Sequence, residues 1–184
     1  MSLEWKSVKL SEIARIDFGT RVTQKRDSGT MYPVYGGGGE TFRVDLFNRN
    51  SCLIVSRFAM SEQCVRFVDG KFFLNDSGLT VSATSEEISQ QFLDHVLMAS
   101  SKRIYSLGRG TAQKNLDLPK FRELQIPVPP IESQAMFVAQ LNELSSLIAI
   151  GKSKAREQMV EFDLLQDRIL ELFLNGELDE KKRS

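Results

Sequence analysis

Short apolar runs separated by turn residues dominate the first two thirds of the chain. Each run is rich in Val, Ile, Leu or Phe, which is typical of β-strands. Asp69-Gly70 separates two of them, and because glycine adopts a positive φ at no steric cost, we expect a two-residue hairpin turn there. The expected strands are residues 52–58, 64–68, 71–74 and 79–82.

Two helices interrupt this pattern. Thr84 followed by Glu87 has the spacing of a capping box, in which each side chain bonds the other residue's backbone N–H. Apolar residues then recur at helical spacing, which predicts a helix that ends near Ser100. Asp117 is expected to cap a shorter helix over residues 118–124. The first helix would bury Ile88, Phe92, Val96 and Ala99.

The pattern changes at residues 126–130, where Ile-Pro-Val-Pro-Pro places three prolines in five positions. Proline lacks a backbone N–H and clashes with a preceding helical turn, so no helix or central strand passes through such a segment. We therefore expect one domain over residues 1–130 and a helical region over residues 131–184.

The helical region carries apolar residues in two series, each with a seven-residue repeat. Nine of the eleven positions are apolar, which predicts a long helix or helical pair with a continuous apolar seam. One helix cannot bury such a stripe alone, so it needs another segment or another chain, although packing on its own domain is an alternative. Gly151 lies within the seam and suggests a kink or break. The seam consists of Phe137, Leu141, Leu144, Ile148, Phe162, Leu165, Ile169 and Leu172, with Gly151, Ala155 and Gln158 between them.

Composition excludes several classes of protein. The chain has 184 residues, 41% of them hydrophobic and 26% charged, which suits a globular domain with a short appendage. No apolar run is long enough to span a bilayer, and no export signal is visible, so we expect a cytoplasmic protein without a membrane partner. Two cysteines and one histidine are too few for a structural zinc site. We expect no metal and no cofactor.

The formal net charge of +0 conceals an uneven distribution. Residues 1–130 carry 17 basic and 14 acidic side chains, whereas residues 131–184 carry 7 and 10. Within the first part, residues 100–122 hold six basic side chains against the single acid Asp117. This segment is a candidate anion-facing surface, with a solvated face and local salt bridges as the alternative.

The usual catalytic motifs are absent. There is no phosphate-binding loop, no dinucleotide fingerprint, no aminomethyltransferase motif and no serine nucleophile elbow. Asp69-Gly70-Lys71 has the acid-x-lysine spacing of metal-dependent nucleases, with Asp45 as a second carboxylate. A small metal-dependent DNA nuclease that uses Asp45, Asp69 and Lys71 is therefore the alternative from the enzyme class, and otherwise we assign no catalytic residue. His95 is a lone histidine on the first expected helix.

Several short motifs occur in an order that resembles a known family. The first three are residues 32–39 (Tyr-Pro-Val-Tyr followed by four glycines), 55–60 and 110–116. The proline segment follows, with Glu132 and Gln134 directly after it. Together these motifs resemble the target-recognition domain of type I restriction-modification specificity subunits. The outer parts of the pattern are Trp5, Leu10 and Gly19 near the start and Phe173, Gly176 and Leu178 near the end.

This resemblance implies a mixed α+β target-recognition domain followed by a long, coiled-coil-like helical region. It implies a non-catalytic subunit that binds double-stranded DNA and directs a methyltransferase subunit and, indirectly, a restriction subunit. Family members usually carry two recognition domains spaced by an antiparallel coiled coil, whereas this chain has one domain and one helical region. It thus resembles half a subunit, which would form a homodimer on a palindromic split target, join a different half, or be a fragment. A helical adaptor without a DNA role is a third class.

Candidate DNA contacts follow from side-chain chemistry. Arginine pairs with guanine and Gln or Asn with adenine, which favours Arg57, Gln113 and Asn115 as base readers. Glycine backbone approaches phosphate closely, with a tyrosine hydroxyl beside it. As alternatives, Arg57 pairs internally with Asp76 and the glycine run is only a mobile loop. The candidates are Tyr35, Gly36, Gly37, Gly38, Arg57, Arg66, Lys102, Arg103, Arg109, Gln113, Lys114 and Asn115.

Overall fold

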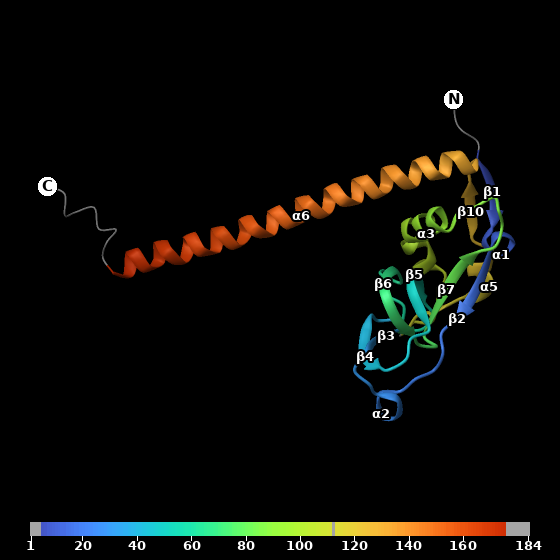
Figure 1. Cartoon of the computed structure of the whole chain (residues 1–184), viewed down its shortest axis with the longest axis horizontal. Coiled ribbons are helices and arrows are strands. Elements are labelled where there is room, and N and C mark those ends of the chain that lie inside the picture. The colour runs from blue at the N-terminus through green and yellow to red at the C-terminus, as the bar shows by residue number, and fades with distance from the viewer. Residues whose placement is uncertain (1–4, 112, 176–184) are drawn as a thin grey trace. The chain divides into compact units, whose positions relative to one another are not determined.

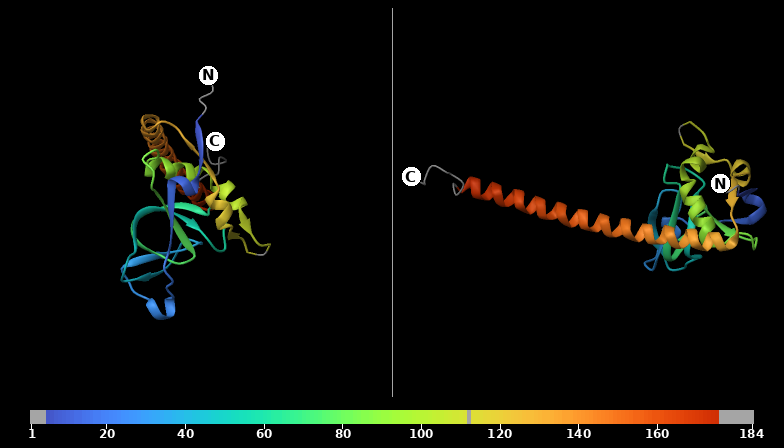
Figure 2. Two further views of the ribbon diagram at one scale, coloured as in Figure 1. Left: turned by 90° about the vertical axis from the view of Figure 1, so that its right-hand side faces the viewer. Right: turned by 90° about the horizontal axis from the view of Figure 1, so that it is seen from above.

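A six-stranded sheet forms the centre of the first part of the chain (Figure 1). In this computed structural model, residues 5–111 and 113–175 are described. The strand order is β2-β7-β5-β6-β3-β4, and all neighbours are antiparallel except β3 and β6. Figure 2 shows that the strands in the middle of the sheet curve. The strands are β2 (Ala14–Phe18), β3 (Tyr32–Tyr35), β4 (Glu40–Val44), β5 (Arg49–Ser56), β6 (Val65–Leu74) and β7 (Gly78–Ala83).

Two smaller sheets complete the strand structure. β1 (Lys6–Lys9) pairs antiparallel with β10 (Gln125–Val128), which joins segments far apart in the sequence. β10 contains Pro127 but has only one neighbour, so the expectation that no central strand crosses the proline segment is confirmed. β8 (Gly108–Arg109) and β9 (Asn115–Leu116) form a short hairpin.

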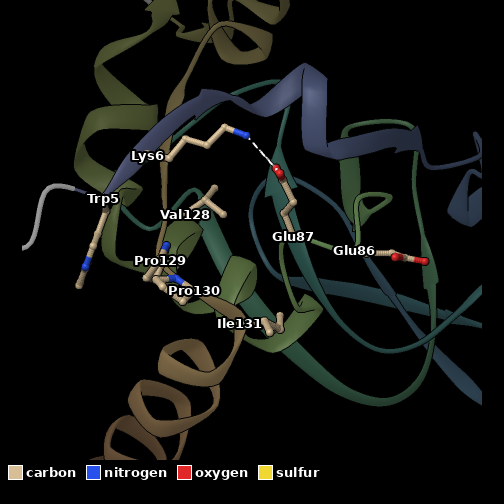
Figure 3. A pocket seen from close by; sticks show the side chains of 8 residues that line it. All are labelled: Trp5, Lys6, Glu86, Glu87, Val128, Pro129, Pro130 and Ile131. Atoms are coloured by element: carbon tan, nitrogen blue, oxygen red, sulfur yellow. Dashed lines mark hydrogen bonds and ion pairs between the residues drawn. The ribbon is translucent and has the colours of Figure 1, made fainter.

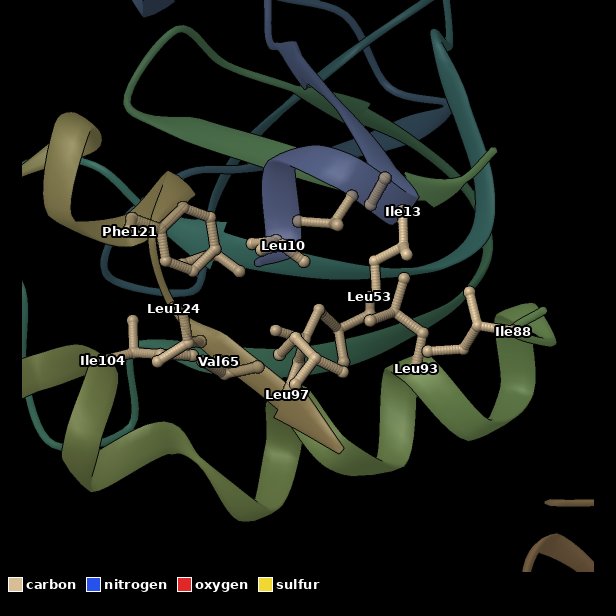
Figure 4. Packing of buried hydrophobic residues seen from close by; sticks show 14 of the residues in the cluster. Leu10, Ile13, Leu53, Val65, Ile88, Leu93, Leu97, Ile104, Phe121 and Leu124 are labelled. Atoms are coloured by element: carbon tan, nitrogen blue, oxygen red, sulfur yellow. The ribbon is translucent and has the colours of Figure 1, made fainter. Parts of the chain in front are cut away.

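Helices pack on one side of this framework and enclose the main core. Figure 4 shows Leu93 and Leu97 of α3 and Ile104 of α4 among the buried side chains of α1, α5 and β5. All of these core side chains are at most 2% exposed. Because helices and a mostly antiparallel sheet share this core, the mixed α+β class is confirmed. The helices are α1 (Leu10–Ile13), α2 (Gln24–Asp27), α3 (Gln90–Ala99), α4 (Ser101–Ser106) and α5 (Leu118–Arg122).

The hairpin expected at Asp69-Gly70 is wrong, because β6 runs unbroken through both residues. The register with β5 shifts there, and a single residue, Ser51, lies opposite the pair. The Ser51 hydroxyl donates to Asp69 Oδ1 (2.7 Å) and accepts from the Gly70 N–H (2.9 Å). Gly70 has a φ of 75°, and a positive-φ glycine suits a β-bulge as well as a hairpin. The partner strand β5 continues on both sides, which selects the bulge.

The capping box at Thr84 and Glu87 is also wrong. Helix α3 begins at Gln90, and its N-cap is Ser89, whose Oγ accepts the Phe92 N–H at 3.3 Å. The Thr84 N–H instead bonds the Ile13 carbonyl, so Thr84 still belongs to the edge of the sheet. The Asp117 cap is confirmed, because its side chain accepts the Lys120 N–H at the start of α5.

The last helix, α6 (Ile131–Leu174), is 44 residues long. It continues through Gly151 without the expected break, because a glycine keeps every backbone hydrogen bond and costs only about 1 kcal/mol of helix propensity relative to alanine. The chain divides into two compact units, residues 1–138 and 139–184. The first turns of α6 thus belong to the first unit, where Gln134 and Val138 are buried. The ring centroids of Phe137 and Trp5 lie 5.3 Å apart there.

The second unit consists of the remainder of α6. Of its described residues, 139–175, only Leu172 is partly buried and the others are exposed. Among the seam residues, Leu141 is 40% and Phe162 is 66% exposed. Within the described ranges no helix is apolar enough over sufficient length to cross a membrane.

Candidate functional site

Gly37 connects several of the candidate residues. Its carbonyl accepts hydrogen bonds from the Ser56 hydroxyl (2.9 Å) and from Nη2 of Arg66 (3.0 Å). Its N–H donates to the hydroxyl of Ser77 at 3.3 Å. The loop after β3 is therefore tied to the end of β5, the start of β6 and the turn before β7.

The four glycines of this loop have different surroundings. A Cβ on Gly36 would lie 2.3 Å from Ser77 Oγ, and one on Gly37 would lie 2.4 Å from the Phe58 carbonyl oxygen. Both positions thus require glycine for packing. Gly38 is exposed, and a Cβ there would meet nothing within 4 Å. Gly39 has a φ of 118°, and its Cβ would approach Arg66 Nη1 at 3.2 Å.

Arg57 is held from several sides. Its Nη1 donates to the Asp76 carbonyl oxygen at 2.8 Å, and the guanidinium lies over the rings of Phe18 (4.2 Å) and Phe58 (4.8 Å). Its backbone N–H bonds the Ser77 carbonyl and its own carbonyl accepts the Leu116 N–H. The internal pairing with Asp76 therefore exists, but it uses the backbone carbonyl rather than the carboxylate.

The segment after Arg57 contacts the β8–β9 hairpin. The Met60 N–H donates to the Lys114 carbonyl at 2.9 Å, and the Ala59 N–H to Oδ1 of Asn115 at 3.3 Å. Ala59 has a φ of 48°, which is uncommon for a residue with a side chain and is maintained only where the surrounding contacts hold it. We call the resulting surface the glycine-loop edge; it comprises residues 35–39, 56–60, 66, 76–77 and 113–116.

The glycine-loop edge brings together nine of the twelve candidate DNA contacts. Tyr35 packs edge-on against Phe72 at 5.5 Å, and Lys114 places Nζ 4.1 Å from the Tyr105 ring. Gln113 is exposed. The amide oxygen of Asn115 already accepts the Ala59 N–H. The nine are Tyr35, Gly36, Gly37, Gly38, Arg57, Arg66, Gln113, Lys114 and Asn115.

The remaining basic candidates lie elsewhere. Arg109 donates from Nε to Asp117 at 2.5 Å, and Lys120 Nζ lies 3.8 Å from the same carboxylate. Burial opposes ionisation of Asp117, but the hydrogen bonds from Arg109 and the Lys120 N–H, with the charges of both side chains, lower its pKa below the usual value. Asp117 therefore neutralises part of the basic segment. Lys102 and Arg103 are exposed on α4.

The residues of the nuclease alternative have structural partners. Asp45 Oδ1 accepts the Thr30 N–H at 2.8 Å, and Asp69 belongs to the β-bulge. Lys71 Nζ lies over the Phe47 ring at 4.6 Å. Across residues 5–111 and 113–175, no group of three or more His, Cys, Asp or Glu side chains is arranged to hold a metal ion.

A surface pocket of about 510 Å³ lies where β1, β10 and the start of α6 meet (Figure 3). Its lining is mainly apolar, and Lys6 on β1 forms an ion pair with Glu87 at 3.1 Å across one side. The pocket contains none of the candidate DNA contacts. It is lined by Trp5, Lys6, Glu86, Glu87, Val128, Pro129, Pro130 and Ile131.

Sequence reasoning missed the residues that hold the glycine-loop edge in place. Ser56 ends β5, Phe18 ends β2 and Ser77 lies in the turn before β7. Ser56 belongs to the 55–60 motif, but no periodic pattern reveals the contacts of the three residues. Ser56 is 2% exposed, and a buried hydroxyl at the end of an apolar strand was the one available signal, because it requires a hydrogen-bond partner.

Known proteins are similar to this chain in sequence. The EcoDI specificity subunit of a type I restriction enzyme from Escherichia coli is 23% identical over 188 residues, covering 100% of this chain and 41% of its own length. The MjaVIII specificity subunit of Methanocaldococcus jannaschii is 32% identical over 96 residues, covering 51% of this chain and 22% of its own length. The chain thus spans less than half the length of these relatives.

Solved structures share the fold. The S subunit of a type I restriction-modification system from M. genitalium has a TM-score of 0.68 at 22% identity and covers 83% of this chain and 44% of its own. The HsdS subunit from Thermoanaerobacter tengcongensis has a TM-score of 0.62 at 18% identity, covering 97% and 46%. The family model for the type I restriction modification DNA specificity domain matches residues 2–159, which is most of the chain. The chain belongs to this family of DNA specificity domains.

Proposed function

We propose that the chain is a non-catalytic DNA specificity subunit of a type I restriction-modification system, with residues 1–130 as the DNA-binding domain. The glycine-loop edge carries the proposal, because five separate segments meet there and place basic side chains beside exposed backbone. Basic groups supply the sequence-independent part of DNA affinity, and amide or guanidinium side chains supply base discrimination.

Within this edge the residues take different roles. Arg57 donates a hydrogen bond to the Asp76 carbonyl, and Arg66 donates one to the Gly37 carbonyl. Both side chains therefore position the loop rather than read bases. Gly38 lies in open space and is the point where a phosphate approaches the backbone. The exposed Gln113 is the best candidate for pairing with adenine.

The helical region, residues 131–184, completes the proposal. Its exposed seam pairs with a second copy, so that two half subunits form a homodimer on a palindromic split target, and the same region docks a methyltransferase subunit. Light scattering of the chain alone should give a mass near twice 20.8 kDa, which increases further when a type I methyltransferase subunit is co-expressed. A strict monomer that ignores the methyltransferase would contradict this assembly.

DNA binding is tested with a carboxylate placed at the loop. Gly38→Asp has room for its side chain and should weaken binding to a duplex library at least about tenfold, because it repels phosphate. The matched control is Ser11→Asp on α1, outside the glycine-loop edge, which should bind within about twofold of the parent. Gln113→Ala should instead alter which sequences are selected. Equal DNA binding by Gly38→Asp and the parent would contradict the assignment of the glycine-loop edge as the DNA-binding surface.

The nuclease alternative makes the opposite prediction. If Asp69 held a catalytic metal, the parent would cleave DNA in the presence of Mg²⁺ and Asp69→Asn would not. We expect no cleavage by either protein. Asp69→Asn should affect only folding stability, because its carboxylate accepts the Ser51 hydroxyl and the Gly70 N–H within the bulge.

A further inference from the structure

Two exposed phenylalanine rings lie against Arg57. Phe18 ends β2 and is 41% exposed, and Phe58, within the glycine-loop edge, is 42% exposed. Single exposed apolar side chains are ordinary on a protein surface, whereas several at one place more often mark a binding surface. We propose that Phe58, with Phe18 beside it, contacts the 5-methyl group of a thymine in the major groove of bound DNA. This inference rests on the DNA-binding role proposed above and names one base that the edge selects.

Arg57 holds both rings without covering them. Its guanidinium carbon lies 4.2 Å from the centroid of the Phe18 ring and 4.8 Å from that of Phe58. The guanidinium is itself fixed, because Nη1 donates to the Asp76 carbonyl at 2.8 Å. Neither ring belongs to the hydrophobic clusters that the described residues form. The two rings therefore lie on a fixed cation at the surface and do not contribute to the core.

The backbone on both sides of Phe58 is also fixed. The carbonyl of Arg57 accepts the Leu116 N–H at 2.8 Å, and the Ala59 N–H donates to Oδ1 of Asn115 at 3.3 Å. A side chain that is already ordered loses little conformational freedom when it contacts a ligand, and this preorganisation favours binding. Phe58 thus combines an exposed apolar surface with a position that binding does not have to order.

Thymine is the base that suits such a ring. It alone presents a methyl group at the major-groove edge of a base pair, whereas the other three bases present only hydrogen-bond donors and acceptors there. A phenyl ring cannot pair with those groups, and covering them without a partner costs free energy. The basic side chains of the same edge, Lys114 among them, supply the attraction for the neighbouring phosphates. An apolar contact within this basic edge therefore favours thymine at one position.

Insertion of the ring between base pairs would be a different use of an exposed phenylalanine. Proteins that kink DNA insert apolar side chains as wedges between neighbouring bases. A wedge needs both faces of the ring free, but one face of Phe58 lies against Arg57. Contact with a methyl group needs only the exposed part of the ring and leaves the guanidinium contact in place. The geometry therefore favours a contact in the groove.

Replacement of thymine by uracil tests this inference, because the two bases differ only in the 5-methyl group. Duplexes are first selected from a random library with the full chain, and each thymine of the selected sequence is then replaced by uracil in turn. At the thymine that Phe58 contacts, replacement should weaken binding about fourfold, the factor expected when one methyl group loses its apolar contact. All affinities are measured at one salt concentration, because phosphate contacts make them depend on salt.

Variants of the chain assign the effect to the ring. Phe58→Ala should bind the thymine and uracil duplexes within about 1.5-fold of each other, and Phe58→Leu, which keeps an apolar side chain, should retain most of the difference. The matched control is Phe67→Ala, which removes a ring that is 49% exposed on β6, outside the glycine-loop edge. This control should keep the full difference. Comparing two duplexes for each variant cancels any general change in affinity.

The outcomes separate the thymine contact from the proposed function. A parent chain that binds its selected duplex but tolerates uracil at every position would overturn the contact and leave the DNA-binding role standing. A difference that persists in Phe58→Ala would also overturn it, because the methyl group would then act through DNA shape or another residue. A parent chain that binds no duplex would overturn both.

Discussion

The two units contain apolar residues in similar abundance but use them in opposite ways. In the first unit, side chains such as Phe121 and Leu93 are fully buried, and the sheet, the helices and the start of α6 share one core. In the second unit, Leu144 and Leu165 are 54% and 61% exposed on a helix without internal partners. The same abundance of apolar residues therefore accompanies a buried core in the first unit and exposed side chains in the described part of the second.

The sharpest test of this comparison is the same truncation in each unit. Phe121→Ala should lower the free energy of unfolding by roughly 3–5 kcal/mol, because a fully buried aromatic side chain leaves a cavity. Leu165→Ala should leave the unfolding of the first unit unchanged and instead weaken self-association. Denaturant titration with a fluorescence probe at Trp5, together with light scattering, measures both. A large loss of first-unit stability in Leu165→Ala would contradict the division.

The boundary between the units is probed by Gln134, which is fully buried in the first turns of α6. Its Oε1 accepts the Ser89 N–H, and its Nε2 donates to the carbonyls of Glu87 and Pro129. Gln134→Leu should lower the free energy of unfolding by roughly 1–3 kcal/mol, because these groups lose their partners. The same change at the exposed Gln140, across the boundary, should have almost no effect on that quantity.

Neighbouring glycines of the loop sharpen the comparison within the first unit. Gly37→Ala should lower the free energy of unfolding by about 1–3 kcal/mol, because the new Cβ would lie 2.4 Å from a backbone oxygen that cannot easily move. Gly38→Ala should change it by less than about 0.5 kcal/mol. Thermal unfolding of both variants checks this, and equal melting temperatures would refute the packing role of Gly37.

The smallest effect concerns pH. Because the folded-state pKa of Asp117 is lowered, its contribution to stability is present above the ordinary pKa of about 3.9 and is lost as pH falls through the lowered value. Asp117→Asn should therefore be less stable than the parent at neutral pH, and the difference should shrink below about pH 4. Unfolding curves between pH 7 and pH 2 measure this difference in stability. A difference that grows as the pH falls would contradict a lowered pKa of Asp117.

Local signals in the sequence predicted the elements that depend on local chemistry. The Asp117 cap, the strand at residues 79–82 and the long helix were all predicted, because a cap, an apolar run and a repeat are readable within a few residues. The hairpin at Gly70 failed because a bulge uses the same backbone conformation and depends on a partner strand. The capping box at Thr84 failed because the Thr84 N–H bonds the Ile13 carbonyl at the edge of the sheet, and α3 begins after Ser89 instead.

The candidate site was predictable only as a set of residue types. Glycines, arginines and an amide-bearing hairpin suggested DNA contact, and the structure brings most of them to one edge. The contacts that hold them join residues 19 to 59 positions apart, such as Ser56 with Gly37 and Leu116 with Arg57. No periodicity encodes such pairs, so the internal hydrogen bonds of Arg57 and Arg66 are visible only in the fold.

The glycine-loop edge is tied together mainly through backbone carbonyls, those of Gly37, Asp76 and Lys114 among them. A carbonyl is present whichever side chain a residue carries. Exposed positions such as Gly38 and Gln113 can therefore mutate during evolution while the scaffold around them stays folded. In the proposed role of this edge, one or two surface substitutions would change the DNA preference with little loss of folding stability along the path.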